Sequence, residues 1–366
     1  MRQVLLWLGP LPIYGFGAML FVTFVSCYWL LGRRAEREGI RKQYVHDLAI
    51  WIFVAGIIGA RIVFMIQYDV PLVDFYKVWE GGLVFYGSAL GGLVGFLLGW
   101  WFIIRKQGID VWVLADVIAP AIALGLALGR IGCLLNGCCY GHVACADCPA
   151  VHFPLCAPPR MTLVERGYQT AAGFALDDFD PTGRTVRAVE PGSPAAAAGL
   201  QAGDVIVDVD GIKVAAYDDL WKHLVANWPR GQSELELTVD RAGQTVALPP
   251  FTPRTIGLHP TQLYETISMF LMFALLLAWE PFQRRRGELI VILMLGYGVH
   301  RFINESLRND TAKYTPLGEG LALTLSQWIS IVVFVGGLAV LAALLRQPTI
   351  KPPTPAPELA DAPAGA

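Results

Sequence analysis

The sequence predicts an α-helical polytopic membrane protein that carries a soluble α+β domain between two groups of helices. Hydrophobic residues make up 55% of the 366 residues and charged residues only 16%, a balance typical of integral membrane proteins. The apolar residues gather in stretches close to the roughly 20 residues that a helix needs to cross a bilayer. About seven such stretches occur, at 11–31, 46–67, 82–104, 112–136, 258–280, 287–305 and 325–345.

The loops between these stretches differ in charge, and this predicts the orientation. Basic residues follow the first, third, fifth and seventh stretches, whereas the alternate loops are poorly basic. The basic residues are Arg33, Arg34, Arg37, Arg41, Lys42, Arg105, Lys106, Arg284, Arg285, Arg286 and Arg346. Because cytoplasmic loops are enriched in Lys and Arg, we expect the N-terminus outside and the C-terminus inside. The first stretch is too long for the apolar core of a signal peptide and is expected to remain as an anchor.

The segment between the fourth and fifth stretches has a different composition. Residues 160–256 carry 13 acidic and nine basic side chains and contain no apolar run of membrane length. "SELELTVDR" and "QTVALPPF" alternate like paired strands, and "YDDLWKHLVAN" has the pattern of an amphipathic helix. The predicted organisation is a membrane part at 1–157, an extracytoplasmic insert at 158–256, a second membrane part at 257–346 and a disordered cytoplasmic tail at 347–366.

One stretch of the insert, "PGSPAAAAGLQAGDVIVDVDG", resembles the core of a bacterial-type PDZ domain, and the resemblance covers residues 170–252. It implies binding of an extended peptide by strand addition, often with capture of its C-terminal carboxylate. The expected peptide-binding loop and strand are Gly173, Phe174, Ala175 and Leu176. The alternative is a PDZ-like fold that serves only for packing or spacing.

Several polar residues lie within the predicted spans, where they are costly and usually functional. Arg61 lies in the second stretch and Arg130 in the fourth, and "YGVHRFINESLR" places His300, Arg301, Asn304 and Glu305 in the sixth. Arg301 and Glu305 are four residues apart, so they share a helix face and are expected to pair. One interpretation is internal ion pairing that fixes helix packing, with Arg61 pairing with an acid such as Asp116.

The second interpretation is an anion site built on Arg130 and Arg301. Guanidinium groups bind phosphate in a bidentate manner and stay charged in apolar surroundings. The anion available at that depth is a phospholipid head group. The formal net charge of −2 argues against a nucleic-acid partner.

Four motifs follow one another along the chain: "GGLVFYGSALGG", "GRIGCLLNGCCYG", "HPTQLYE" and "YGVHRFINESLR". With the expected spans and orientation, this ordered set resembles the prolipoprotein diacylglyceryl transferase family over residues 10–142 and 257–346. The resemblance implies transfer of a diacylglyceryl group from phosphatidylglycerol to the lipobox cysteine of preprolipoproteins, with release of glycerol 1-phosphate, in the bacterial inner membrane. It implies phosphatidylglycerol, preprolipoprotein signal peptides and membrane lipids as partners, and no cofactor.

The resemblance also implies which residues form the site. The expected catalytic residues are Arg130, Arg301, Tyr86 and Glu305. The residues expected to contact the phosphatidylglycerol head group are Arg130, Asn136, Gly141, Tyr14, Arg61 and His259. For His259, which is followed by a proline suited to the first turn of a helix, a hydrogen-bonding or capping role is preferred to that of a base.

The chain departs from the family pattern at three of these motif positions. Tyr86 stands where many relatives have a histidine proposed as the base, and Cys133 and Cys138 stand where asparagine and glutamate are common. A phenol with a pKa near 10 is a poor base unless a cation lowers that pKa. Either Tyr86 is a tuned base or hydrogen-bond donor, or the arginines activate the acceptor thiol. The alternative function is a catalytically inactive transferase-like scaffold whose PDZ-like insert binds peptides.

Six of the seven cysteines lie between residues 133 and 156. Three interpretations are open: one or more disulfides, since the outer compartment is oxidising, reduced packing, or a metal site at Cys145, Cys148, His152 and Cys156. A disulfide involving Cys145 or Cys148 is preferred, and no metal is expected.

Overall fold

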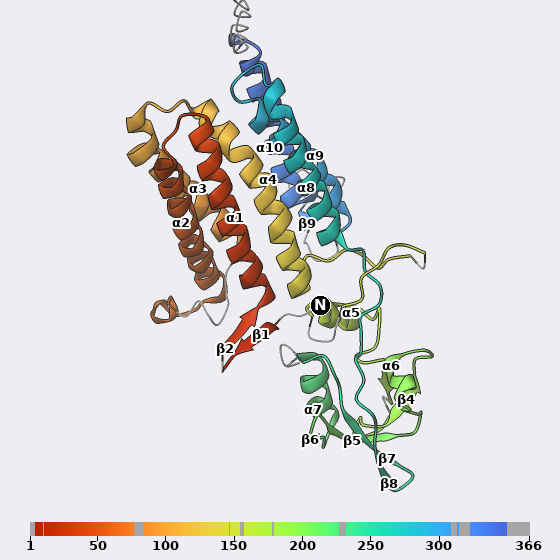
Figure 1. Ribbon diagram of the computed structural model, residues 1–366. Coiled ribbons are helices and arrows are strands. Elements are labelled where there is room, and N and C mark those ends of the chain that lie inside the picture. The colour runs from red at the N-terminus through yellow and green to blue at the C-terminus, as the bar shows by residue number, and fades with distance from the viewer. Residues whose placement is uncertain are drawn as a thin grey trace, which may run out of the picture. The chain divides into compact units, whose positions relative to one another are not determined.

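The computed structural model describes residues 4–9, 11–76, 84–145, 147–153, 157–177, 179–226, 232–308, 313–314 and 323–349. The chain divides into two compact units that share the long helices. The first unit holds the chain up to Val22, Leu126–Ser268 and His300–Trp328, and the second holds Thr23–Gly125, Met269–Val299 and the chain from Ile329 onward. Figure 1 shows the elements by label.

The chain begins with a hairpin rather than with a membrane helix. Strand β1 (Val4–Leu8) pairs antiparallel with β2 (Leu11–Tyr14), and helix α1 (Gly15–Arg37) starts directly afterwards. The expected first span at 11–31 is therefore wrong at its start, and its other end lies within α1. Pro12 lacks a backbone N–H and is therefore disfavoured inside a helix. The basic residues after position 31 form the polar last turns of α1.

The helical part contains seven long helices in the described residues, with short 3-10 or π-helical extensions. Beyond α1 they are α2 (Lys42–Tyr68), α3 (Phe85–Gly99) with η3 (Trp100–Ile104) and η4 (Arg105–Gln107), α4 (Val111–Asn136), α8 (Thr261–Trp279) with η6 (Glu280–Phe282), α9 (Glu288–Ser306) and α10 (Leu325–Leu344). A separate short 3-10 helix, η1 (Leu72–Asp74), follows α2. The short strands β9 (Lys313–Tyr314) and β10 (Leu323–Thr324) pair ahead of α10.

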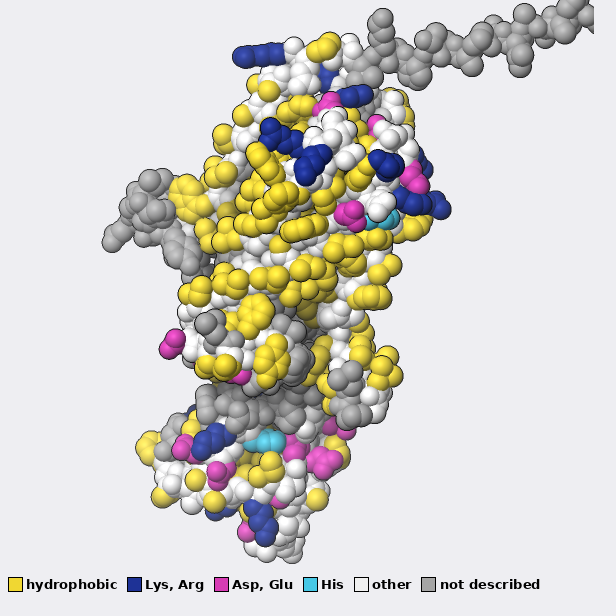
Figure 2. Space-filling view, turned by 90° about the vertical axis from the view of Figure 1, so that its left-hand side faces the viewer, with side chains coloured by type: hydrophobic (Ala, Val, Ile, Leu, Met, Phe, Trp, Pro, Cys, Tyr) yellow, Lys and Arg dark blue, Asp and Glu magenta, His cyan; other side chains and the backbone are white. Residues whose placement is uncertain are grey.

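Among the described residues, six helices are long and apolar enough to cross a membrane: α1, α2, α3 with its extension, α4, α8 with its extension, and α10. Helix α9 is not in this group, since it carries His300, Arg301, Asn304 and Glu305 in its last turns. The count of seven spans is not confirmed. On the face that Figure 2 shows, hydrophobic side chains cover much of the helical part, and basic side chains gather at one end. Such a surface, with Ile66 77% and Val332 69% exposed, requires lipid around it.

Helices α2 and α3 lie side by side (Figure 1) in very close contact, because glycines line the facing surfaces. A Cβ at Gly91 would overlap the carbonyl oxygen of Ala55, and one at Gly87 would overlap the carbonyl oxygen of Gly59. Small residues at such spacing are how membrane helices approach each other when lipid removes the hydrophobic drive. This packing belongs wholly to the second unit.

A buried charged cluster also lies in the second unit. The Arg34 guanidinium pairs with Glu280 at 2.6 Å and donates to the carbonyl oxygens of Asp116 and Val117. The Asp116 carboxylate accepts hydrogen bonds from the Gln283 side chain and from the amides of Gly287, Leu289 and Ile290 at the start of α9. The expected Arg61–Asp116 pair is therefore wrong, because the amides at the N-terminus of α9 satisfy this carboxylate.

The insert between α4 and α8 forms a small α+β fold in the first unit. It runs through α5 (Pro159–Glu165), β3 (Phe174–Leu176), β4 (Val186–Val189), α6 (Pro194–Ala197), β5 (Val205–Val209), β6 (Ile212–Lys213), α7 (Tyr217–Trp221) with η5 (Lys222–Ala226), β7 (Leu237–Arg241) and β8 (Gln244–Ala247). Strands β6, β5, β7 and β8 form one antiparallel sheet in that order, and β3 pairs with β4.

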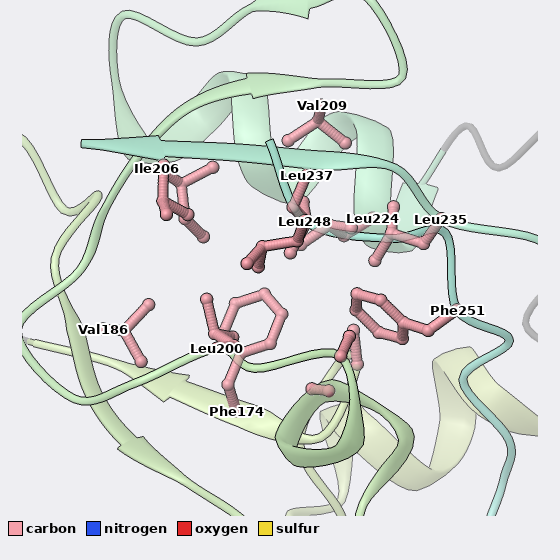
Figure 3. Packing of buried hydrophobic residues seen from close by; sticks show 14 of the residues in the cluster. Phe174, Val186, Leu200, Ile206, Val209, Leu224, Leu235, Leu237, Leu248 and Phe251 are labelled. Atoms are coloured by element: carbon pink, nitrogen blue, oxygen red, sulfur yellow. The ribbon is translucent and has the colours of Figure 1, made fainter. Parts of the chain in front are cut away.

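The core of the insert is apolar and closed. Phe174, Leu200, Leu224 and Phe251 point toward one another from four different segments (Figure 3), and all are buried. The paired strands predicted from "SELELTVDR" and "QTVALPPF" are confirmed as β7 and β8, which run antiparallel. The predicted amphipathic helix is confirmed as α7 with η5.

Candidate polar site at the ends of three helices

The candidate site lies where the end of α4, the start of α8 and the end of α9 meet in the first unit. The backbone joins these segments: the Gly141 amide donates to the His259 carbonyl oxygen, and the His142 amide donates to the Leu307 carbonyl oxygen. A Cβ at Gly141 would collide with His259 and with the Leu307 carbonyl oxygen. Only glycine fits at position 141, between the backbone segments of His259 and Leu307. The structure therefore brings together three of the four sequence motifs.

Glu265 is the centre of the site. Its carboxylate oxygen Oε2 lies 3.0 Å from Arg130 Nε and accepts hydrogen bonds of 3.0 Å from Arg301 Nη1 and Asn304 Nδ2. The residue is 1% exposed. A buried carboxylate persists only when cations and hydrogen bonds compensate its lost hydration, and here two arginines from two helices do so.

Glu305 forms the second carboxylate of the site. Its Oε2 lies 2.7 Å from Arg301 Nη2 and 3.2 Å from Arg308 Nη1, so the predicted Arg301–Glu305 pair is confirmed. Arg301 Nη2 also donates to Ser326 Oγ at 3.1 Å. We call this group of Arg130, Glu265, Arg301, Glu305 and Arg308 the five-charge cluster. Three guanidinium groups against two carboxylates leave it with an excess of one positive charge.

Three buried acceptor atoms of this site have no hydrogen-bond partner among the described residues: Glu265 Oε1, Glu305 Oε1 and Asn304 Oδ1. An unpaired buried acceptor typically costs about 1–3 kcal/mol, so a group of them marks either bound water or a place for a ligand. A ligand suited to this site carries one negative charge and hydroxyl donors.

The other predicted site residues have different positions. Asn136 ends α4 and hydrogen-bonds the side chain of Cys138, and His259 Nδ1 lies 3.4 Å from the Tyr264 hydroxyl. Tyr14 ends β2 and is 37% exposed.

Two predicted residues belong to the second unit. Arg61 is buried on α2, and its guanidinium donates to the backbone carbonyl oxygens of Asp74 and Phe75. Tyr86 lies in the first turn of α3, and its side chain is outside the described residues.

The sequence prediction missed Glu265 and Arg308. Glu265 is the last residue of the motif "HPTQLYE". An acidic residue in the first turns of a helix of membrane length indicates a functional site, because burying its charge in the membrane is as costly as burying that of an arginine. Arg308 closes the fourth motif and lies just past the end of α9.

The cysteine-rich segment begins with a glycine-capped helix end. Gly137 has φ of 79°, and the amides of Gly137 and Cys138 both donate to the Cys133 carbonyl oxygen, as in a Schellman C-cap. Further along, Cys145 and Cys148 form a disulfide, so the preferred prediction is confirmed. The alternative interpretation, a metal site at Cys145, Cys148, His152 and Cys156, would need both of these sulfur atoms as free thiolates, and Cys156 lies outside the described residues.

Cys133, Cys138 and Cys139 carry no disulfide. Their three sulfur atoms all lie within 4.8 Å of one another, and each residue is half-buried. Arg130 Nη1 lies 4.0 Å from the Cys133 sulfur. This trio of thiols therefore adjoins the five-charge cluster.

Comparison with known proteins gives the family. The model of the prolipoprotein diacylglyceryl transferase family matches residues 3–343. Curated relatives named phosphatidylglycerol–prolipoprotein diacylglyceryl transferase include one from Rhodopirellula baltica, 28% identical over 90% of this chain and 72% of the relative. Others come from Clostridium tetani, 24% identical over 93% and 96%, and Neisseria meningitidis, 27% identical over 92% and 93%. A multi-pass helical structure and three motif segments joined around buried charges agree with this match: the chain belongs to the prolipoprotein diacylglyceryl transferase family.

Proposed function

We propose that this protein transfers the diacylglyceryl group of phosphatidylglycerol to the lipobox cysteine thiol of preprolipoproteins in the bacterial inner membrane and releases glycerol 1-phosphate. The observation that carries the proposal is the five-charge cluster. It lies at the ends of membrane-length helices, has one excess positive charge and leaves carboxylate oxygens without partners. Its chemistry fits a lipid head group made of one phosphodiester and a glycerol.

The arginines act on the phosphate. Arg130 and Arg301 bind the phosphodiester and stabilise the negative charge that grows on the leaving phosphate as the C–O bond breaks. Both guanidinium groups are held by Glu265, and Arg301 is also held by Glu305, so they are in place before substrate arrives. The unpaired oxygens of Glu265 and Glu305 accept hydrogen bonds from the hydroxyls of the head-group glycerol.

The remaining expected residues line the path of the head group in this proposal. Asn136 and Gly141 shape the segment beside the cluster, and His259 serves as a hydrogen-bonding post. Tyr14, Arg61 and Tyr86 keep the roles that the family resemblance implies. Tyr86 either activates the acceptor thiol or donates a hydrogen bond to a substrate oxygen.

The proposed topology has seven crossings, with the N-terminus outside and the C-terminus in the cytoplasm. Helix α9 supplies the seventh crossing, because 19 residues span about 28 Å and its polar residues are compensated within the five-charge cluster. The basic residues after α1, α3, α8 and α10 are then cytoplasmic. The insert lies on the extracytoplasmic side.

The insert is proposed to be a PDZ-like module that receives an extended peptide along β3. Within the described part of the chain, β3 pairs only with β4, so its second edge is available for strand addition. Gly173, with φ of 90°, turns the chain into this strand, and Phe174 anchors the strand in the core. Ala175 and Leu176 offer the edge. Because the Gly173 amide is held by Thr170 Oγ1 at 3.0 Å, carboxylate capture requires the amides that follow.

Complementation tests the function. In a bacterial strain depleted of its own transferase, the wild-type gene should restore growth and shift the mass of a reporter lipoprotein by one diacylglyceryl group. The alternative, an inactive scaffold whose insert binds peptides, predicts no mass shift from a protein that is correctly inserted and abundant. The absence of a shift under those conditions would reject the enzyme.

Deleting residues 172–251 tests the insert. The deletion removes the insert core and keeps Gln169, whose side chain accepts the Ile256 amide. We expect the deletion variant to retain measurable transfer to a lipobox peptide. It should no longer bind longer peptides with a free C-terminus, whereas the full-length membrane protein should bind them. An amidated peptide is the control for carboxylate capture. Loss of all transfer in an inserted deletion variant would show that the insert is part of the site.

A further inference from the structure

Three thiols converge beside the charged cluster, and the mechanism above uses none of them. The sulfur atoms of Cys133, Cys138 and Cys139 lie within 4.8 Å of one another. A zinc–sulfur bond is about 2.3 Å, so three sulfurs around one zinc ion lie about 4 Å apart. The observed spacing therefore needs only small side-chain adjustments to place one ion between all three.

The backbone holds this spacing at a cost. Cys139 has φ of 61°, in the left-handed region that non-glycine residues avoid. Helix α8 fixes the turn from the other side: Thr261 Oγ1 donates to the Cys139 carbonyl oxygen at 2.6 Å, and Gln262 Nε2 donates to the Cys138 carbonyl oxygen at 2.7 Å. Two anchored carbonyls and a strained residue are typical of a preorganised site rather than of thiols that merely fill space.

A positive charge lies beside the trio. Arg130 Nη1 lies 4.0 Å from the Cys133 sulfur. Three thiolates and one Zn²⁺ carry a net charge of one negative, and the Arg130 guanidinium group lies beside this charge. Thiolate ligands select soft or borderline ions such as zinc.

Within the described chain, no fourth His, Cys, Asp or Glu belongs to the group. Zinc sites that serve catalysis have three protein ligands and keep the fourth position open. The three cysteines are half-buried, so a substrate thiol can reach such a position.

We propose that Cys133, Cys138 and Cys139 bind one Zn²⁺ ion whose open fourth position takes the acceptor thiol of the lipobox cysteine. This inference rests on the proposed transferase function for the identity of the thiol. The sequence leaves open how the acceptor thiol is deprotonated, because Tyr86 stands where many relatives have a histidine. A thiol bound to zinc is deprotonated, so no histidine is needed.

On the acceptor side, the thiol displaces water from zinc and releases its proton to solvent. The bound sulfur then attacks the carbon of the diacylglyceryl group that is bonded to the phosphate oxygen, forming the C–S bond. The bond between that carbon and the oxygen breaks, and its electron pair stays on the phosphate oxygen of the released glycerol 1-phosphate. No oxidant or reductant is required.

Metal analysis of the purified full-length protein tests the site. We expect close to one zinc per chain in the wild type and a large loss in the Ser variants of Cys133, Cys138 and Cys139. Cys27→Ser is the matched control, because Cys27 is also a cysteine without a disulfide in a long helix. Cys156→Ser should also keep its zinc. Metal-free wild type, or loss of zinc in Cys156→Ser, would overturn an open three-cysteine site.

Cobalt substitution tests the open position. The Co²⁺ form should show sulfur-to-cobalt charge transfer that increases when a lipobox peptide with a free thiol is added. The same peptide with serine in place of the cysteine should leave the spectrum unchanged. A spectrum that ignores the thiol peptide would overturn the proposed fourth ligand.

The two proposals fail separately. Wild-type protein that lipidates its substrate but holds no zinc, with its three thiols alkylated freely or joined as a disulfide, rejects the zinc site and leaves the transferase intact. Protein that binds zinc and the peptide thiol but yields no mass shift rejects the transferase and keeps the metal site.

Discussion

Two buried charged clusters lie in the long helices, and they differ in how completely their hydrogen bonds are made. In the second unit, Asp116 accepts four hydrogen bonds and Arg34 pairs with Glu280 while donating to two carbonyls. In the first unit, the carboxylates of Glu265 and Glu305 each leave one buried oxygen unpaired. Both clusters require compensation of buried charge, yet only one is incomplete.

The difference distinguishes buried polar residues that stabilise the fold from buried polar residues that bind a ligand. The Asp116 cluster caps the start of α9, and nothing remains for a ligand to add. The five-charge cluster has spare acceptors and one excess positive charge, so an anionic group with hydroxyls would complete it. Position in an apolar helix marks a residue as important, and its unmet hydrogen bonds indicate the reason.

Glu265→Gln should have the largest effect on stability. The change leaves Arg130 and Arg301 without their shared carboxylate, and breaking such a buried pair costs about 3–5 kcal/mol. Because an anion can replace the lost charge, phosphatidylglycerol should raise the thermal stability of this variant more than that of the wild type. Thermal unfolding in detergent with and without the lipid measures both. Equal stabilisation of the two proteins would contradict an anion site at this cluster.

Arg130→Lys and Arg301→Lys should each lower transfer about 100-fold or more, as expected when a transition-state donor is lost. A lysine keeps the charge, but it is a point charge and cannot reproduce the planar bidentate contacts of a guanidinium group. The matched control is Arg34→Lys in the second unit, which should destabilise the protein without lowering the rate per folded molecule. Transfer assays on inserted protein decide this. Full activity of both Lys variants of the first unit would remove the phosphate role.

Asp116→Asn should weaken folding and spare the chemistry. The amide group of asparagine directs donors at the Gln283 side chain and at the amides at the start of α9, so a loss of about 2 kcal/mol is expected. The rate of transfer by the folded fraction should stay that of the wild type. A selective loss of rate without a loss of stability would show that the two clusters do not differ as described.

A pair in the insert should show the smallest effect. The hydrogen bonds and charge of Arg241 hold the pKa of Asp204 below its usual value. A depressed carboxyl pKa gives stability that is present above the unfolded pKa, near 4, and is lost as the pH falls through the folded pKa. Hydrogen exchange of β5 and β7 in the full chain, corrected for intrinsic rates, should show this acid-side loss in the wild type. Asp204→Asn should remove that dependence, and an unchanged profile would contradict the pair's role.

The helical part was largely predictable, because apolar length and flanking charge set it directly. The error at the first span came from Pro12, whose missing N–H favoured the β1–β2 hairpin over a longer helix. The close approach of α2 and α3 was not predictable from hydropathy, since it depends on which glycines face each other. In the insert, strand alternation predicted β7 and β8 because Leu237 and Val239 of β7 are buried on one face and Val246 of β8 packs against the same core.

The site was predictable in part. Arg130, Arg301 and Glu305 were identified because charge in an apolar helix is rare, and the same reasoning applies to Glu265. The partner of Asp116 was wrong because backbone amides at a helix start leave no trace in the side-chain sequence. The grouping of Cys133 with Cys138 and Cys139 depends on a left-handed residue after a glycine cap, which spacing alone does not indicate.

The central claim is that the incomplete cluster handles the phosphatidylglycerol head group, and one assay tests it most directly. Purified wild-type protein is incubated with a lipobox peptide and with either phosphatidylglycerol or phosphatidylethanolamine, and the peptide mass and released glycerol 1-phosphate are measured. We predict a gain of one diacylglyceryl group per peptide thiol, equal release of glycerol 1-phosphate, and much slower transfer from phosphatidylethanolamine. No transfer from phosphatidylglycerol by folded protein, or equal use of both lipids, would contradict the account.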